Sequence, residues 1–361
     1  MKDLREPLLG GDQKTDAVPK LGAKGERDSE GFRKPRWFGY VYMLIFVLMI
    51  CMQQLLGKIL FTRTPQMTAT QLLFLRSITA AIIFACLMNK NIKYYMYTSI
   101  ERRHIGDLVV RVLQGLFMLV CIYTSVKYLP LVYTSLTSNL GPLLTAVFSY
   151  IFLKKGLSKI DVIILVVSFL GVVIMILGSF QSDSPSPTNP GLQPSSLWIP
   201  VLAMLAVPVL SASQAIVLRQ LREMDEYTVG SYTSFSMVLI YGPIVLFSQG
   251  EGLSYLSSFQ TLDWVIIIGL GFSSTLVNLC RTKSSQYEEP AKLAVVSYFQ
   301  SVFQLFFDLL FFNTFFSTYQ VLGIAVVLGA SSVRWGFGIK NNFFSKKGEK
   351  KSVSSAGPSK V

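Results

Sequence analysis

The sequence predicts an all-α polytopic membrane protein with ten transmembrane helices arranged as two inverted five-helix repeats. Three observations predict this class. Ten apolar segments of about 20 residues are long enough to cross a hydrocarbon core of roughly 30 Å. Lysine and arginine residues fall between these segments on alternate sides. A Pro/Ser/Gly-rich loop divides the segments five and five.

The expected helices follow the apolar runs of the chain. Their ranges are Phe38–Leu60, Thr68–Asn89, Asp107–Tyr128, Val132–Leu153, Lys159–Gly178, Leu197–Arg219, Glu226–Ser248, Thr261–Lys283, Pro290–Phe312 and Ser317–Phe337. The polar stretches 1–37 and 339–361 have few bulky apolar side chains, so we expect disordered tails there. A charged stretch precedes the first segment, which has full spanning length, so we expect a signal anchor and no cleavable signal peptide.

The basic residues indicate the orientation of these helices. One set of connections carries almost all of them, including Lys90, Lys154 and Arg334, whereas the other set carries Arg63 and little else. By the positive-inside rule both termini are cytoplasmic. The net charge of +13 then reflects topology and contacts with anionic membrane lipids, and we expect no nucleic-acid partner. The plasma membrane and the endomembranes are left as alternatives.

An internal repeat follows from the odd number of helices in each half. The linker 179–196 contains no lysine or arginine and is expected on the non-cytoplasmic side, between a first repeat at 38–178 and a second at 197–338. Two homologous halves of five helices must enter the membrane from opposite sides. A shift of 159 residues aligns Ser125–Leu140 with Ser284–Phe299 and matches serine or tyrosine at three positions.

Several classes of chemistry lack their residues. His104 is the single histidine, and the four cysteines have no paired spacing, so neither a metal site nor histidine-based catalysis is expected. The phosphate-binding pattern GxxxxGK[ST] is absent from the sequence, which argues against transport driven by ATP hydrolysis. We therefore expect a protein that is not an enzyme and uses no cofactor.

Two stretches of the first half resemble a known family. They are QLLFLRSITAAII at Gln71–Ile83 and the run Leu108–Leu157. With Arg76, Tyr128-Leu-Pro-Leu131 and Pro142, they resemble the EamA-type half-repeat of the drug/metabolite transporter superfamily. The second half resembles it faintly, at 287–293 and Gly323.

Over 38–338 the architecture is most similar to the eukaryotic solute-carrier branch with two EamA repeats. The resemblance implies ten helices in two inverted repeats and alternating access to a central cavity. One departure is Lys154-Lys155, at a place where many members have a glutamate. Any role of that glutamate does not carry over to this chain.

Arg76 is the charge that topology does not explain. It lies about eight residues, or roughly 12 Å, from the outer end of its segment, too deep for easy snorkelling. One interpretation is a structural arginine bonded to the carbonyl groups of a broken neighbouring helix. The other is an anion-binding group.

Uncharged polar residues at similar depth suggest a cavity between the two repeats. The candidate substrate-binding residues are Arg76, Asn139, Ser297, Tyr298, Gln300, Gln304 and Gln54, with Gln53, Gln214 and Asn278 at comparable depth. Hydrogen bonds between helices are the alternative for each of them. The sequence Asn139-Leu-Gly-Pro142 also predicts a break in the fourth helix, and Pro208 and Gly242-Pro243 predict kinks.

Other charged residues have simpler explanations. Lys58 is expected to snorkel to the outer interface, and Arg111 to anchor its helix at the cytoplasmic interface. Arg281 lies near Glu288 and Glu289, and either pairs with an acid at a gate or lies in or beside a solvated loop, and we favour the loop. Asp308, within QLFFDLLFF, is either a proton-coupling carboxylate or one that reaches the interface or pairs with a lysine, and we favour the second.

These observations predict a secondary transporter or exchanger that moves a small polar, anionic or zwitterionic metabolite by alternating access. The expected partners are a small-molecule solute and membrane lipids, and a homodimer is left open. The alternative is a polytopic scaffold or receptor-like protein without transport. Its one indication is Glu6-Pro-Leu-Leu9, an incomplete acidic di-leucine sorting signal.

Overall fold

The computed structural model describes the helical body of the chain. The described residues are 37–98, 104–141, 143–144, 147–148, 159–181, 198–221, 224–247, 256–257, 259–287, 293, 296–297, 299–313, 316–330 and 332–333. Within these ranges the regular structure is helical and includes no strand. Apart from Trp37, with which α1 begins, both predicted tails lie outside them, as does the predicted linker from residue 182 on.

The described helices follow the apolar runs. They are α1 (Trp37–Arg63), α2 (Ala69–Met88), α3 (Ile105–Tyr128), α4 (Leu131–Ser138), α6 (Lys159–Gln181), α7 (Trp198–Gln220), α8 (Glu226–Phe247), α9 (Thr261–Tyr287) and α11 (Phe299–Phe312), with a further apolar helix at Thr318–Ala330. Two short helical turns, Asn89–Asn91 and Tyr94–Thr98, follow α2.

Six helices are long and apolar enough to cross a membrane, namely α1, α2, α3, α7, α8 and α9. Their outer surfaces are apolar, with Leu239 75% and Phe117 59% exposed, whereas glutamine, serine and threonine side chains are buried between the helices. Apolar outside and polar inside is the distribution that lipid favours. The chain is thus an integral multi-pass membrane protein, and ten crossings stay a prediction.

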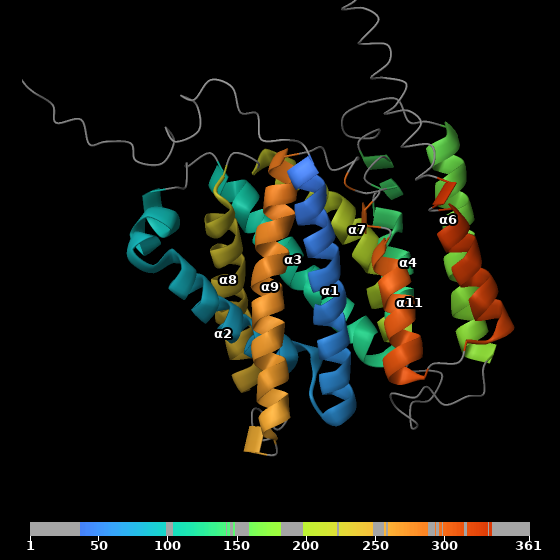
Figure 1. The fold of residues 1–361 in the computed structure, drawn as a ribbon, viewed down its shortest axis with the longest axis horizontal. Helices are drawn as coiled ribbons and strands as arrows, with labels where there is room; N and C mark the ends of the chain where they lie inside the picture. The colour runs from blue at the N-terminus through green and yellow to red at the C-terminus, as the bar shows by residue number, and fades with distance from the viewer. Residues whose placement is uncertain are drawn as a thin grey trace, which may run out of the picture. The chain divides into compact units, whose positions relative to one another are not determined.

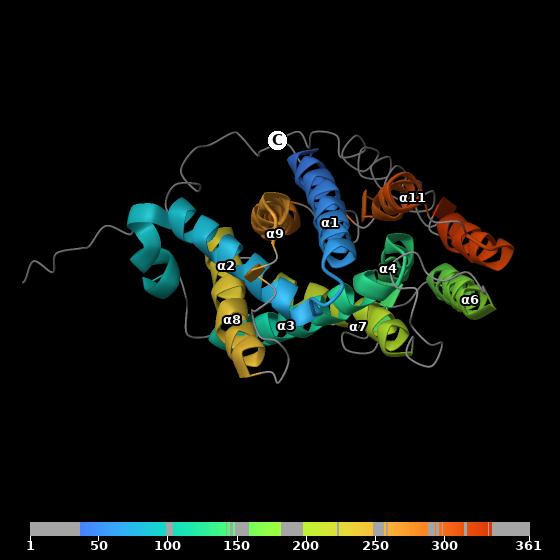
Figure 2. The same ribbon diagram turned by 90° about the horizontal axis from the view of Figure 1, so that it is seen from below.

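The helix contacts pair the two halves of the chain. α1 packs along α9, α3 packs along α7, and α2 packs with α8, as the two ribbon views show (Figure 1, Figure 2). Within their halves, α1 and α7 are first, α2 and α8 second, and α3 and α9 third. Exchanging the halves turns the pair α1–α9 into α7–α3 and leaves α2–α8 unchanged. Two repeated halves produce this pattern of contacts.

The residues at the helix ends and breaks explain the local structure. α2 starts with a capping box, in which the Thr68 hydroxyl accepts from Gln71 N at 3.3 Å and Gln71 Oε1 accepts from Thr68 N at 2.7 Å. α4 ends at Ser138, and Asn139 follows as a turn residue that keeps right-handed helical backbone angles, with helix again at 140–141. Pro142 lies outside the described residues, so the predicted break there stays a prediction. α7 and α8 continue through their internal prolines.

Glycine allows two helix pairs to approach closely. A Cβ added to Gly271 of α9 would overlap the Thr79 hydroxyl of α2 and lie 3.0 Å from Ala80 N. A Cβ on Gly57 of α1 would lie 2.7 Å from Cε1 of Tyr123 on α3. Small residues at such crossings are how membrane helices pack without a hydrophobic driving force between them. These contacts fix where α1, α2, α3 and α9 meet.

Candidate functional site

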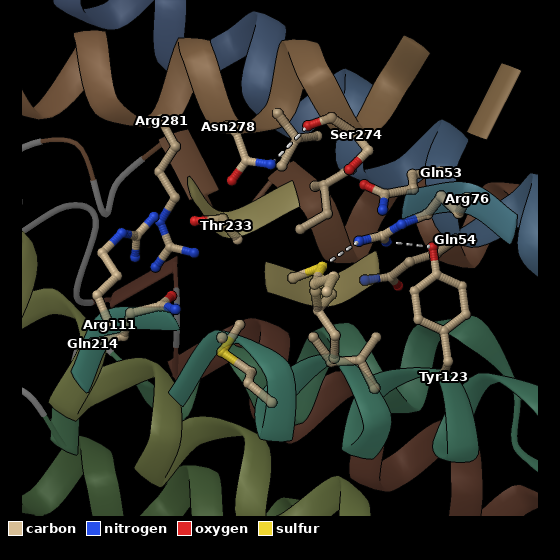
Figure 3. Close-up of a pocket in the computed structure, with 17 residues that line it drawn as sticks. Gln53, Gln54, Arg76, Arg111, Tyr123, Gln214, Thr233, Ser274, Asn278 and Arg281 are labelled. Carbon is tan, nitrogen blue, oxygen red and sulfur yellow. Dashed lines mark hydrogen bonds between the residues drawn. The ribbon is translucent and has the colours of Figure 1, made fainter. Parts of the chain in front are cut away.

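A partly open pocket lies where α1, α2, α3, α7, α8 and α9 converge, with a cavity volume of about 70 Å³. Its polar lining residues are Gln53, Gln54, Arg76, Arg111, Tyr123, Gln214, Thr233, Ser274, Asn278 and Arg281 (Figure 3). The first three helices of each half all contribute to it. This volume holds a few water molecules, so a larger ligand requires the long side chains to move.

Arg76 forms one end of the pocket. It is 2% exposed and lies seven residues into α2, about 10 Å along the helix axis. Its Nη1 donates to the Tyr123 hydroxyl at 3.1 Å, and Nη2 lies 3.9 Å from Met237 Sδ (Figure 3). Nε has no hydrogen-bond partner among the described residues. Among the described residues, the guanidinium contacts the tyrosine hydroxyl and ring and the thioether, and no carboxylate.

Arg111 of α3 and Arg281 of α9 lie together at the opposite end of the pocket (Figure 3). Arg111 is 4% exposed, and its Nε and Nη1 are buried without partners in the described part of the chain. The sequence predicted that Arg111 anchors α3 at the cytoplasmic interface. Its side chain is instead buried in the protein, because its face of α3 turns toward α7 and α9. Arg281 lies over the Phe46 ring at 5.7 Å.

Amide side chains line the space between the arginines. Gln53 and Gln54 lie near Arg76, Gln214 lies beside Arg111, and Asn278 lies between the two ends (Figure 3). Asn278 Nδ2 donates to the Ser274 carbonyl at 3.1 Å. Amides offer both donors and acceptors and add no charge.

The lining is strongly cationic. It includes three arginines, and no aspartate or glutamate appears among the lining residues that the structure describes. Glu226 of α8 pairs with Lys283 of α9 at 2.9 Å. A buried guanidinium without an acid partner is costly in a membrane helix. The arrangement is suited to binding a negatively charged group, because arginine donates two parallel hydrogen bonds to a carboxylate or phosphate.

The predicted binding residues fall into two groups. Arg76 and Gln54 line the pocket, and Gln304 of α11 donates a hydrogen bond to Gln54 from behind. Asn139 does not line it: its Nδ2 donates to the Ser301 hydroxyl at 2.8 Å and joins α4 to α11. The backbone carbonyl of Gln300 lies 3.7 Å from the Cys51 thiol, again outside the lining.

The structure describes only one of the two remaining predicted residues. Ser297 is half-buried and lies outside the lining, and Tyr298 lies outside the described residues. The sequence did not single out Tyr123, Thr233 or Ser274. Hydroxyl side chains are common in membrane helices and often bond to their own backbone, so they carried no signal.

A second buried polar cluster lies outside the pocket lining. Lys58 Nζ and Asp308 Oδ1 are 3.2 Å apart, and the two side chains are 3% and 0% exposed. Lys58 is thus buried and does not snorkel, and Asp308 pairs with a lysine as we favoured. The Asp308 carboxylate also accepts from Leu131 N at 3.1 Å and Val132 N at 2.8 Å. It satisfies the free amides at the start of α4.

Comparison with known proteins identifies the family. The profile of the EamA-like transporter family matches residues 37–177 and 198–333, once in each half of the chain. The chain belongs to the EamA-like transporter family. The two matches confirm the predicted resemblance and the predicted division into two EamA repeats.

Relatives of this EamA protein are distant. It is 22% identical over 230 residues to the uncharacterized membrane protein YMR253C of Saccharomyces cerevisiae, covering 62% of this chain and 55% of that one. It is 23% identical over 242 residues to the probable transport protein YPL264C of the same yeast, covering 63% and 66%. The chain therefore spans less than two thirds of the length of either yeast protein.

One bacterial relative has a more specific name. The pseudopaline exporter CntI of Pseudomonas aeruginosa is 22% identical over 231 residues, covering 64% of this chain and 73% of the exporter. A solved crystal structure with 13% identity superposes with a TM-score of 0.55 over 83% of this chain and 96% of that one. At that identity it shows a shared fold alone. The family and the named relatives support a membrane transporter.

Proposed function

We propose that this EamA protein is a secondary transporter or exchanger of a small anionic metabolite, which moves by alternating access through the pocket around Arg76. The observation that carries the proposal is the buried Arg76 guanidinium, with Tyr123 and Met237 as its neighbours and Nε unpartnered among the described residues. An anionic group supplied by the solute would satisfy this charge. Arg76 would then bind the solute directly.

Electrostatics favour an anion over a cation or a neutral solute. A charge at mid-membrane depth costs about 3 kcal/mol or more when it has no partner. Three arginines in one lining multiply that cost, and a bound anion offsets it while gaining charge-assisted hydrogen bonds. A cationic solute would face repulsion from all three. Zwitterions with an accessible carboxylate remain within the proposed class.

The repeated halves support alternating access. The helix pairs exchange when the halves exchange, so a second conformation with the roles of the halves reversed would keep equivalent helix pairs. In the described conformation Arg63 Nε pairs with Asp263 Oδ1 at 2.6 Å, across the ends of α1 and α9 that we predict to be non-cytoplasmic. The half-buried Arg281 lies toward the opposite ends of these helices. The pocket would therefore be reached from the cytoplasmic side.

Counterflow in liposomes tests the proposal. Purified full-length protein is reconstituted and preloaded with one unlabelled candidate, and uptake of the same labelled compound is measured for carboxylates, amino acids, phosphorylated sugars and nucleotide sugars. We expect counterflow for at least one anion and none for matched cations. No counterflow across the whole panel would contradict transport and favour a scaffold.

Substitution of Arg76 links that activity to the pocket. Arg76→Gln removes the charge but keeps hydrogen-bonding capacity, and we expect loss of counterflow with unchanged expression. Lys93→Gln is the matched control, because Lys93 is exposed and lies outside the lining. Full activity in Arg76→Gln would show that Arg76 does not bind the solute.

A further inference from the structure

Resting on the proposed function, we propose that Arg111 and Arg281 form a second anion-binding subsite, so that the solute carries an anionic group at each of its two ends. Arg76 would bind one group, and the pair of arginines would bind the other. From the sequence, Arg111 was expected to be a topology anchor, and Arg281 was expected in or beside a solvated loop. In the structure the pair lines the same pocket as Arg76 (Figure 3).

The two subsites are separated along the helices that carry them. Tyr123, which contacts Arg76, lies twelve residues beyond Arg111 on α3, or about 18 Å of helix rise. Ser274 and Arg281 lie seven residues apart on α9, about 10 Å. Arginine side chains are long and shorten this gap. A ligand on the order of 10 Å in length or less would reach both ends.

The pair of arginines has the features of a binding group and lacks those of an internal ion pair. Arg111 and Arg281 are close enough to repel one another electrostatically. Arg111 Nε and Nη1, both buried, have no acceptor among the described residues. Nearby Gln214 is neutral, and its Oε1 is also buried without a described partner. An anionic group between the two guanidiniums would relieve the repulsion and accept from both.

The central lining favours a polar, flexible connector between the two anionic groups. Asn278 and Thr233 lie between the ends and offer hydrogen bonds without charge (Figure 3). Carboxylate and phosphate share the geometry that an arginine fork recognises, so either can occupy each end. The predicted solute class is a linear dicarboxylate or a phosphorylated carboxylic acid.

A binding experiment with matched probes tests this inference without requiring transport. The probes are succinate, adipate and suberate, each compared with its monoamide, which has the same length and one charge fewer. A second arm compares 3-phosphonopropionate with its carboxamide. Affinity is obtained from the ligand-dependent thermal stabilisation of the full-length protein in detergent at constant ionic strength. We expect at least tenfold tighter binding of the diacid than of its monoamide at the best length.

Variants test whether Arg111 and Arg281 bind the second anionic group of the diacid. Arg111→Gln and Arg281→Gln should each reduce the ratio of diacid to monoamide affinity to about one while the monoamide still binds. Arg76→Gln should weaken both probes. Lys93→Gln should change neither. If a glutamine variant does not fold, Arg111→Lys and Arg281→Lys keep the charge but not the fork, and should lower the ratio.

The outcomes separate this inference from the proposed function. Two results would overturn the two-ended solute. One is a ratio of diacid to monoamide affinity near one at every length in the unmodified protein. The other is a ratio that Arg111→Gln and Arg281→Gln leave unchanged. Counterflow of monoanions, together with a ratio of diacid to monoamide affinity near one, would support transport and contradict the second subsite. A high ratio without any counterflow would support the subsite and contradict transport.

Discussion

The ammonium group of Lys58 on α1 lies 3.2 Å from Oδ1 of Asp308 on α11, and the two residues are separated by 250 positions in the sequence. Lys58 also donates to the Leu129 carbonyl at 3.3 Å. The Asp308 carboxylate accepts from two amides at the start of α4. One buried ion pair therefore joins three helices from the two repeats.

Removing one partner of this pair should destabilise the protein strongly. We expect Asp308→Asn to lower the free energy of unfolding by about 3–5 kcal/mol, because Lys58 would be left charged and buried without its partner. Denaturation of the purified protein in detergent measures the change. The double variant Lys58→Met with Asp308→Asn should recover part of the loss. A single variant as stable as the unmodified protein would show that the pair does not hold α1 against α11.

Tyr123 should act on Arg76 by positioning it. Tyr123→Phe removes the hydroxyl that accepts from Arg76 Nη1 at 3.1 Å, a hydrogen bond worth about 0.5–1.5 kcal/mol. In the proposed transporter this should weaken apparent solute affinity several-fold, measured as KM for counterflow, and leave the maximal rate largely intact. Loss of activity as complete as in Arg76→Gln would indicate that the hydroxyl contacts the solute itself.

The close approach of α2 and α9 should not tolerate a methyl group. In Gly271→Ala the new Cβ would overlap the Thr79 hydroxyl and approach backbone at Ala80, so we expect a loss of about 1–3 kcal/mol in unfolding free energy. Gly106→Ala on α3 is the control, since nothing lies within 4 Å of the added Cβ. It should be neutral or stabilising by up to about 1 kcal/mol. Equal effects of both changes would contradict tight packing at Gly271.

The Arg63–Asp263 pair should affect conformation more than stability. Arg63 is 33% exposed, so solvent screens its charge, whereas Asp263 is 4% exposed; we expect Asp263→Asn to lower the unfolding free energy by about 1 kcal/mol. If the pair closes this side of the protein, breaking it should expose neighbouring buried residues. Met67→Cys, at a position that is fully buried beside the pair, should then react faster with a membrane-impermeant maleimide in a cysteine-free background. Gln66→Cys, already exposed, should react equally with and without Asp263→Asn.

Sequence reasoning identified the residues whose properties are local anomalies. Arg76 stands out because a charge within an apolar run has no local explanation, and the structure places it in the pocket lining. Arg111 and Arg281 were missed because a basic residue near a helix end already has a simpler explanation, as a topology charge for Arg111 and as part of a solvated loop for Arg281. Asn139 was predicted at the cavity, but its partner Ser301 lies in the other half of the chain and its pairing has no sequence signal.

Hydropathy and the two-fold recurrence of a family pattern determined from sequence alone that this is a multi-pass EamA protein, since both are properties of consecutive residues. Only the tertiary structure decided which polar side chains meet. That outcome depends on the rotation of each helix about its axis and on close approaches such as the one at Gly57, where α1 lies against Tyr123. A hydropathy profile reports how apolar a helix is but not which side faces its neighbour. The convergence of Arg76, Arg111 and Arg281 on one pocket is therefore a product of packing.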